Sequence, residues 1–542
     1  MKPVKIFMIM VGFYFAVTLT VNSESGYNYT TRVYPGADGK LVSAPDSLGN
    51  IIPDFSNAGY GGGGIRLPIV PNKVTLWGVE GDATPVIQAA IDSVSAMPED
   101  ANGFRGAVLL RAGYYEMNSS VTISTSGVVL RGHGQDELGT ILIGKNVERI
   151  EEEGGRGRRR GRGGLVQIAG SDGAVPDSTT ARKITDDYVP VGARTFTVEN
   201  SMGYKVGDTI LVRRYGNEEW IREIGQDKET VGRNAWRPFI VSYDRVITAM
   251  DGKKITVDAP IMCAIETKWG GGDIVRYSAP GRIENVGIEN LRGISDFDQN
   301  VRQREYGNLD RLPYLAEEYY SDENHWSIFV SIENARNCWI RDITALHFGG
   351  SIVSVSASGT SNTIQDCTSL APVSQRWGGR RFTFSINGQK NLIQRCLSDQ
   401  GRHSFVLQTP DAAGPNVFHD CVATRPYSTS EPHNRWVTGV LYDRVKAPLT
   451  ARYWDYIIGW AGANIVFWNC EGEFRIQQPP TAQNFTFGHI GINATPMNLG
   501  LQDNSKPDGY MESLDVHVTP SSLYLKQLED RLGPQALANI AR

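Results

Sequence analysis

The sequence has few of the features that mark nucleic-acid-binding, zinc-binding or membrane-spanning proteins. Its 542 residues carry a net charge of only −5, so there is no basic excess that would attract nucleic acid. Its six cysteines include no Cys-x-x-Cys pair, which argues against a zinc ribbon or a thioredoxin-like site. Beyond the N-terminus, no run reaches the roughly 20 apolar residues needed to cross a bilayer. A soluble, turn-rich chain with 59 glycines and 26 prolines is therefore expected.

The N-terminus predicts export. Lys2 and Lys5 precede an apolar run over residues 6–19, and small residues follow at positions 21–23. A basic start, a short apolar run and small residues at the cleavage point are typical of secretory signal peptides. We predict a signal peptide over residues 1–23 and a secreted or periplasmic protein that does not insert into a membrane.

Five of the six cysteines recur at near-regular intervals. Their separations are 29 (367−338), 29 (396−367), 25 (421−396) and 49 (470−421) residues, the last being close to two short intervals. A period near 25 residues is typical of solenoids, in which each repeat is one coil stacked on the next. Each cysteine closes a phrase that begins with asparagine: Asn334 to Cys338, Asn362 to Cys367, Asn391 to Cys396, Asn416 to Cys421 and Asn464 to Cys470.

The repeat consists of strand-forming residues and lacks an amphipathic helical stretch. Phrases such as residues 363–367 and 417–421 hold β-branched and aromatic residues, and Gly, Asn, Ser and Pro separate such phrases. Three short strands per coil, with coils about 4.8 Å apart, describe an all-β parallel β-helix. We expect the asparagines and cysteines to stack inside it in columns, with the thiols reduced, because buried cysteine packs as a small apolar residue.

The remaining segments are arranged around this solenoid. Residues 82–94 have apolar residues at helical spacing, which predicts a helix that caps the first coil. The Arg-rich run of residues 156–162 is expected to be a solvated loop. A second interruption, from Asp298 to Asn324, is expected to form a wall or lid of a substrate site. The predicted divisions are an irregular segment at 24–71, the β-helix at 72–500 with insertions at 145–270 and 298–324, and a C-terminal cap at 501–542 with an amphipathic segment at 523–532.

Several phrases resemble a known superfamily. The stretches GAVLLRAGYY (residues 106–115), GVVLRGHG (127–134) and TILIG (140–144), after a capping helix, are similar to the N-terminal coils of pectate-lyase-like, right-handed parallel β-helix proteins. The resemblance extends over residues 75–490. It implies a right-handed β-helix that acts on carbohydrate, since the superfamily includes polysaccharide lyases, glycoside hydrolases and a few esterases.

Aligning the coils on their cysteines places a column of basic residues on one edge. Arg381, His403, His433 and Arg435 fall just before the same strand in consecutive coils, and together they would span roughly 10 Å. Such a column could hold an anionic glycan, because arginine forms bidentate hydrogen bonds with carboxylate or sulfate. It could equally be surface structure in which arginines pair with neighbouring acids.

A uronic-acid polymer as substrate would predict cleavage by β-elimination. That reaction needs a cation for the carboxylate, a base for the C5 proton and a donor for the leaving oxygen. We assign Arg381 and Arg435 to the first role, His403 to the second, and Tyr442 or His433 to the third. Further candidates for substrate binding are Arg380, Arg402, His325, Trp326 and Trp377, whereas His347, His419 and His489 are expected to be structural.

Two other function classes fit the sequence. A glycoside hydrolase would use two carboxyl groups about 5 to 9 Å apart, chosen from Asp322, Glu323, Asp399, Glu431 and Asp443. A non-catalytic binding protein would stack sugars on Trp326, Trp377, Trp436 or Trp460. We predict no cofactor; calcium remains an alternative with Asp296 and Asp298 as the nearest acidic pair. The expected partner is an acidic polysaccharide, bound by a monomer.

Overall fold

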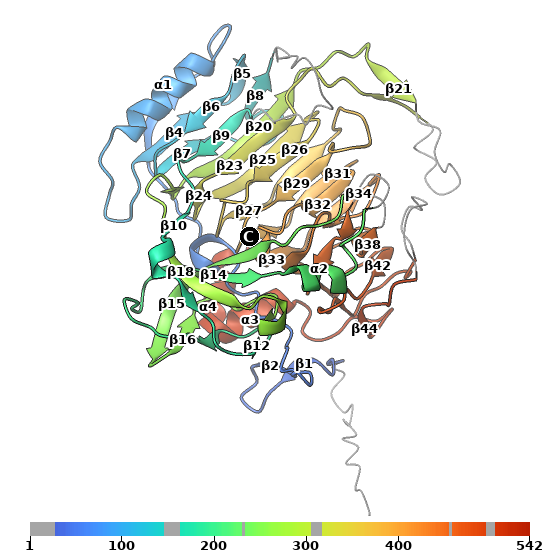
Figure 1. The fold of residues 1–542 in the computed structure, drawn as a ribbon. Helices are drawn as coiled ribbons and strands as arrows, with labels where there is room; N and C mark the ends of the chain where they lie inside the picture. Colours follow the sequence, from blue (N-terminus) through green and yellow to red (C-terminus); the bar gives the residue numbers. More distant parts are fainter. Residues whose placement is uncertain (1–27, 146–162, 230–233, 305–316, 455–457, 495–504) are drawn as a thin grey trace, which may run out of the picture.

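The protein is a right-handed parallel β-helix (Figure 1); the repeat predicts the parallel coils, and the resemblance predicts their hand. A computed structural model describes residues 28–145, 163–229, 234–304, 317–454, 458–494 and 505–542. The predicted signal peptide and the arginine run of residues 156–162 lie outside the described residues. In the described ranges, no helix is both long and apolar enough to span a membrane.

Three parallel ladders of strands run along the helix. The coils from β4 to β35 contribute one strand to each ladder, which confirms the prediction of three strands per coil there. The long strands β20 and β25 belong to both the first and the second ladder. The first ladder comprises β3 (Asn72–Leu76), β4 (Gly106–Leu110), β7 (Val128–Arg131), β20 (Gly287–Ser295), β25 (Trp339–Leu346), β27 (Thr363–Gln365), β30 (Leu392–Gln394), β33 (Ala413–His419), β36 (Val437–Asp443), β41 (Val466–Trp468), β43 (Phe485–Phe487) and β44 (Tyr510–Glu512).

The other two ladders complete each coil. The second adds β5 (Gly113–Met117), β8 (Thr140–Gly144), β28 (Thr368–Leu370), β31 (Leu397–Asp399) and β34 (Val422–Thr424). The third comprises β6 (Val121–Ile123), β9 (Val166–Ala169), β23 (Ile328–Glu333), β26 (Ser351–Val355), β29 (Phe382–Ile386), β32 (His403–Leu407) and β35 (Glu431–Pro432).

A capping helix covers the start of the solenoid, as predicted. Helix α1 (Thr84–Ser95) buries Ile87, Ile91 and Val94 against the interior of the first coils. Its first turn is held by Asp82, whose carboxylate accepts hydrogen bonds from the backbone N–H and the hydroxyl of Thr84 at 3.0 and 2.6 Å. Without such a helix, the apolar end of the first coil would face water.

The cysteine column is confirmed for Cys367, Cys396 and Cys421, which stand opposite one another in the strand register. Cys338 is also buried in the interior core, but it lies opposite Asn362 in the asparagine column, so its predicted place in the stack is wrong. All six cysteines of the chain are free thiols. The residue before each repeat cysteine has a left-handed backbone, with φ between 49° and 55° at Asn337, Asp366, Arg395, Asp420 and Asn469. At Asp366, Arg395 and Asp420 this turn carries the chain from the first ladder to the second, whereas Asn337 precedes the first-ladder part of β25.

The asparagine column is present but shorter than the phrases suggest. The side-chain amide of Asn362 donates to Oδ1 of Asn391 at 2.9 Å, and the amide of Asn391 donates to Oδ1 of Asn416 at 3.3 Å. Asn334 and Asn464 instead adopt positive φ and donate to backbone carbonyls of Gly170 and Met262, at 3.1 and 2.9 Å. The prediction is therefore right for three of the five asparagines.

The first insertion forms an antiparallel sheet that packs against the turns of the late coils. Its strands are β10 (Val175–Pro176), β11 (Arg182–Lys183), β13 (Thr195–Thr197), β14 (Thr209–Tyr215), β15 (Ile240–Asp251), β16 (Lys254–Val257) and β18 (Gly272–Ser278), with β12 (Tyr188–Val189) paired to β17 (Ile265–Glu266) and helix α2 (Glu218–Glu223) beside them. Trp436 and Trp460 are 0% and 1% exposed inside this packing. Their predicted use as sugar platforms is therefore wrong, because the insertion covers them.

The C-terminal helices do not close the end of the solenoid, which corrects the predicted cap. Helix α3 (Leu523–Leu532) and helix α4 (Pro534–Ile540) pack with Phe55 on outward-facing residues of the first ladder such as Val417 and Leu441. The irregular N-terminal segment, with hairpin β1 (Val33–Pro35) and β2 (Leu41–Ser43), covers the same face. These strands are apolar on both faces, so their outer face also needs a cover.

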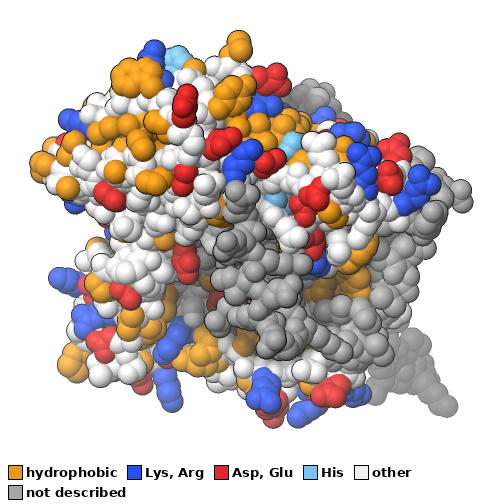
Figure 2. Space-filling model, turned by 90° about the horizontal axis from the view of Figure 1, so that it is seen from above, with side chains coloured by type: hydrophobic (Ala, Val, Ile, Leu, Met, Phe, Trp, Pro, Cys, Tyr) orange, Lys and Arg blue, Asp and Glu red, His pale blue; other side chains and the backbone are white. Residues whose placement is uncertain are grey.

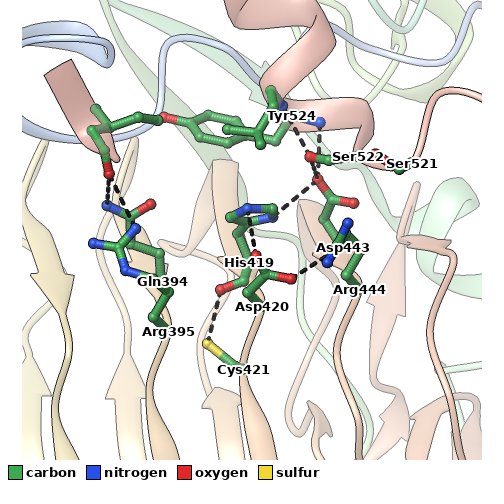
Figure 3. A network of polar contacts seen from close by, with 12 residues as sticks. Gln394, Arg395, His419, Asp420, Cys421, Asp443, Arg444, Ser521, Ser522 and Tyr524 are labelled. Atoms are coloured by element: carbon green, nitrogen blue, oxygen red, sulfur yellow. Dashed lines mark hydrogen bonds and ion pairs between the residues drawn. The ribbon is translucent and has the colours of Figure 1, made fainter. Parts of the chain in front are cut away.

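A polar network fastens helix α3 to that face (Figure 3). Ser522, the N-cap of α3, donates to Asp443 at 2.5 Å, and the backbone N–H of Tyr524 donates to the same carboxylate at 3.0 Å. The His419 ring lies between Asp443 and Asp420, at 3.4 and 3.2 Å. Burial alone would lower the pKa of His419, but the two carboxylates raise it to about 9. His419 is thus structural, as predicted.

Replacing Asn391 with alanine should destabilise the protein. The change leaves the buried N–H of Asn362 without its acceptor and breaks the amide column, and an unsatisfied buried group costs about 1–3 kcal/mol. We expect a loss on the order of 3 kcal/mol in the free energy of unfolding, measured by urea denaturation. Asn102→Ala, at an exposed loop position, is the control and should change stability by less than about 0.5 kcal/mol. Equal stability of both variants would contradict the role of the column.

The stability contributed by His419 should be lost as the pH rises. Its folded pKa of about 9 lies above the unfolded value near 6.5, so the contribution is complete below about pH 6.5 and disappears as the pH passes about 9. We expect His419→Gln to cost on the order of 2 kcal/mol at pH 6 and much less at pH 9.5. Buried thiols also destabilise the fold above about pH 8.5, so the difference between the two proteins is the quantity to measure. A difference independent of pH would count against a charged His419.

Candidate functional site

The structure brings two of the predicted histidines together at the end of the third ladder. His403 begins β32, and His433 directly follows β35, which pairs with β32. Their ring centroids are 4.4 Å apart, and those of both rings lie 4.9 and 5.2 Å from the Phe382 ring. These positions are therefore neighbours in space, while their chemical roles remain predictions.

Glu431 links the two histidines. Its Oε1 accepts a hydrogen bond from Nδ1 of His433 at 2.6 Å and lies 3.5 Å from Nδ1 of His403. Its Oε2 accepts hydrogen bonds from two threonine hydroxyls and lies 3.5 Å from the Arg452 guanidinium. The carboxylate is only 2% exposed, so all its interactions are with the protein.

These contacts keep Glu431 ionised and set the proton position on His433. Burial alone would raise the pKa of Glu431, but the Arg452 guanidinium and the hydrogen bond from His433 hold that pKa well below 4.5. An ionised carboxylate accepts the Nδ1–H of His433, which leaves the lone pair of the neutral ring on Nε2. The side chain of His433 is 16% exposed, so this ring reaches solvent.

His403 is less suited to be the base than the sequence suggested. We expected it at an exposed turn, but it is 0% exposed. Burial, with Arg402 adding to the effect, lowers the pKa of His403 well below 6.5, so the ring is neutral. Its Nδ1 lies 2.7 Å from the carbonyl of Thr429, to which it donates, and Nε2 is buried with no hydrogen-bond partner.

Arg402 and Trp377 lie on the solvent side of this cluster. The Arg402 guanidinium sits 5.6 Å from the centroid of the Phe382 ring and donates to the carbonyl of Gly378. Burial lowers the pKa of Arg402 to about 10, so it stays charged at neutral pH. Trp377, beside Gly378, is 46% exposed and is available to stack on a ligand.

The other arginines of the predicted column point elsewhere. Arg380 forms a bidentate pair with Glu323 at 2.7 and 3.0 Å. Arg381 is 2% exposed and donates to the carbonyl of Ser374 at 2.8 Å. Arg435 is exposed and stacks over Trp236 of the first insertion, 5.9 Å from its ring centroid. The expected line of cation groups is therefore not formed, because consecutive side chains turn to different neighbours.

Three further candidates are part of the interior. Tyr442 is 0% exposed and donates to the carbonyl of Phe405 at 3.2 Å, so it does not face a substrate. Trp326 is 4% exposed within the core of the coils. His325 is 6% exposed, with its ring nitrogens 2.7 Å from the Ser295 hydroxyl and 2.9 Å from the Val373 carbonyl. Their predicted roles in catalysis or binding are wrong.

The carboxylates considered for a hydrolase already have protein partners. Asp399 pairs with Arg425, Glu323 with Arg380, and Asp443 with Ser522 and Tyr524. Asp322 is 4% exposed and accepts the backbone N–H of Asp298 at 2.9 Å. Among the described residues, no two of these carboxylates are found on opposite sides of a shared open space.

The histidine cluster could also offer ligands to a cation. His403, Glu431 and His433 each have a ligand atom within 4.8 Å of the others. Arg452 at the same carboxylate opposes a divalent ion by charge repulsion. Asp296, from the acidic pair considered for calcium, is 2.9 Å from the Lys145 ammonium. Both the prediction that the protein needs no cofactor and the calcium alternative therefore stay predictions.

The site belongs to the surface rather than to an enclosed cavity. Hollows of about 150, 300 and 370 Å³ lie elsewhere, one of them between α2 and the late coils. Of the residues considered for substrate binding, only Trp460 lines one of these hollows, the one beside α2. The face seen in Figure 2 mixes acidic and basic side chains and shows no field of a single sign.

No protein-family model matches the sequence, and no curated protein matches it. Solved structures with a related course of the chain include the tailspike gp49 of Pseudomonas phage LKA1, at 12% identity and a TM-score of 0.39, over 75% of this chain and 55% of the tailspike. A second is the tailspike gp54 of Acinetobacter baumannii phage AP22 bound to capsular saccharide, at 10% identity and a TM-score of 0.29, over 84% of this chain and 74% of the tailspike. A third is the catalytic domain of a GH87 α-1,3-glucanase with tetrasaccharides, at 9% identity and a TM-score of 0.33, over 83% of this chain and 67% of that domain.

This chain thus spans about half the length of the first tailspike. Because these TM-scores are below 0.5, the assignment of the fold rests on the strand pairings of this chain. Membership of the pectate-lyase-like superfamily stays a prediction.

Removal of Glu431 should destabilise the late coils strongly. Glu431→Ala leaves Arg452, which is 3% exposed, without its carboxylate, and an uncompensated buried charge costs about 3–5 kcal/mol. We expect a loss of this size in urea denaturation. Glu99→Ala is the control, since Glu99 forms an exposed pair with Arg105 that is worth about 1 kcal/mol or less. Similar losses in both variants would show that Glu431 is not a structural anchor.

Proposed function

We propose that the protein is a polysaccharide lyase that cleaves an acidic, uronic-acid-containing glycan by β-elimination. The observation that carries this proposal is the 2.6 Å hydrogen bond between Glu431 and Nδ1 of His433. It gives a solvent-reaching imidazole a fixed orientation with Nδ1 on the carboxylate, so Nε2 is the ring nitrogen that would abstract a proton. We further propose that the protein is exported and acts as a monomer.

In this mechanism, His433 replaces His403 as the base. Nε2 of His433 takes the C5 proton of the uronate, the C5–H electron pair forms the C4–C5 double bond, and the C4–O bond breaks. The protonated ring then gives the same proton to the departing oxygen, so no second acid is needed. Arg402 binds the uronate carboxylate and stabilises the charge that develops on it. Trp377 stacks on a neighbouring sugar, and buried His403 positions the ring of His433.

A glycoside hydrolase is the alternative, and the electrostatics of Glu431 argue against it. A hydrolase of the usual kind needs one carboxyl group that stays protonated to assist the leaving group. The pKa of Glu431 lies well below 4.5, so this group cannot serve as that acid near neutral pH. The other acids near the site are engaged by arginine or backbone donors.

His433→Ala should abolish most turnover without unfolding the protein. Loss of a general base typically lowers the rate by roughly 10²- to 10⁴-fold. The assay follows the ultraviolet absorbance of unsaturated products on a panel of acidic polysaccharides, beside a thermal melt. His133→Ala, which removes an exposed histidine of the first coils, is the matched control and should keep full activity.

Three outcomes would speak against this proposal. Near-wild-type activity of His433→Ala would exclude His433 as the base. Release of saturated sugars with new reducing ends would indicate a hydrolase instead. Binding of an acidic glycan with no turnover by the wild-type protein, with or without added calcium, would indicate a binding protein.

A further inference from the structure

A buried arginine lies between two tyrosine rings on the other side of the 374–381 loop. Cζ of Arg376 is 3.6 Å from the ring centroid of Tyr319 and 4.2 Å from that of Tyr427. Tyr319 belongs to β22 (Glu318–Tyr320), which pairs with β21 (Arg302–Arg304) in the second insertion, whereas Tyr427 follows β34. The two rings cover the faces of the guanidinium and leave its in-plane N–H groups to bind a ligand.

Two of the three nitrogens of this guanidinium have no hydrogen-bond partner among the described residues. Arg376 is 8% exposed, and its Nε and Nη1 are buried without a hydrogen bond. The hydroxyls of Ser321 and Ser428, close in sequence to the two tyrosines, are also buried and unpartnered. A group of unsatisfied buried donors is costly unless something else accepts from them.

A second arginine shares the same rings. Cζ of Arg381 lies 5.7 Å from the Tyr319 centroid and 5.2 Å from the Tyr427 centroid. Burial lowers the pKa of Arg381 to about 10, and the charge of Arg376 adds to this, so Arg381 is still cationic at neutral pH. Among the ion pairs of the described residues, neither guanidinium has a carboxylate partner. Two buried cations without a counter-charge favour the binding of an anion.

We infer that Arg376 and Arg381, between Tyr319 and Tyr427, form a second anion-binding site for the carboxylate or sulfate group of a sugar. The planar fork of a guanidinium matches either group with two parallel hydrogen bonds. Arg380 and Arg381 diverge from one loop, which also carries Trp377, so this site lies beside the histidine cluster. The inference deepens the proposed function, because an acidic glycan would supply anionic groups to neighbouring subsites.

Binding of simple anions tests the site independently of turnover. Titrating the wild-type protein with sodium glucuronate or sodium sulfate, at constant ionic strength with chloride, should give a saturable rise in melting temperature, and glucose should give none. A response to one anion alone would identify the group as a carboxylate or as a sulfate. The inactive His433→Ala variant should show the same response, so failure of the lyase proposal and failure of this one are distinguishable.

Variants of Arg376 then test whether the anion-induced rise in melting temperature comes from this site. Arg376→Met should weaken anion binding at least tenfold, and Arg376→Lys should restore only part of it, because lysine lacks the planar fork. The control is Arg214→Met, which removes another buried arginine, stacked 3.9 Å from the ring centroid of Trp220, and should keep the response. An absent or non-saturable response in the wild-type protein, or an unchanged response in Arg376→Met, would overturn the inference.

Discussion

The hydrogen bonds between successive coils are the constraint on which the rest of the structure depends. Every strand of the three ladders pairs in parallel with the strand of the next coil. A slip of one residue would exchange the inward and outward side chains along a strand. The column of Asn362, Asn391 and Asn416 fixes this register at the turns, because each amide also accepts a backbone N–H of the preceding coil. The site at His403 and His433 exists only because β32 and β35 are held in that register.

The fold is completed by two segments that are distant in sequence. Outward residues of the first ladder are apolar, so the N-terminal segment and the C-terminal helices cover them in one cluster. Apolar packing has little directional preference, whereas the contacts of Asp443 with Ser522 and with His419 are directional. The beginning of helix α3 is therefore fixed by charge and hydrogen bonds, and its remaining length by apolar contact.

The sequence predicted the fold more completely than the site. The cysteine period, the strand-forming phrases and the apolar spacing of residues 82–94 each depend on a regular pattern of burial, and each was confirmed except for the place of Cys338. The packing of helix α3 on the outer face of the first ladder was missed. Leu523–Leu532 has the pattern of any amphipathic helix, and this pattern does not indicate which surface the helix packs on. The buried position of Trp460 was missed because the covering sheet comes from a distant insertion.

Coil alignment could place a residue on an edge but could not set the direction of its side chain. Arg380, Arg381 and Arg402 were all assigned to one cleft, yet they contact Glu323, Ser374 and Gly378 respectively. Which neighbour each arginine meets depends on loop conformations that no local pattern encodes. Glu431 was considered as a hydrolase acid or as a partner of the arginines, although its position two residues before His433 was the one local sign of the pair that it forms with His433.

The two histidines show how burial alone can separate the roles of identical side chains. His403 is enclosed beside Arg402 and stays neutral, with Nδ1 engaged by a backbone carbonyl and Nε2 sealed from solvent. His433, with its ring centroid 4.4 Å away, has the same carboxylate as a neighbour but keeps 16% of its side chain exposed. Because proton transfer requires contact with the substrate, only the second ring can act directly. The first ring, Phe382 and Glu431 then limit its movement, so the buried half of the cluster supports the exposed half.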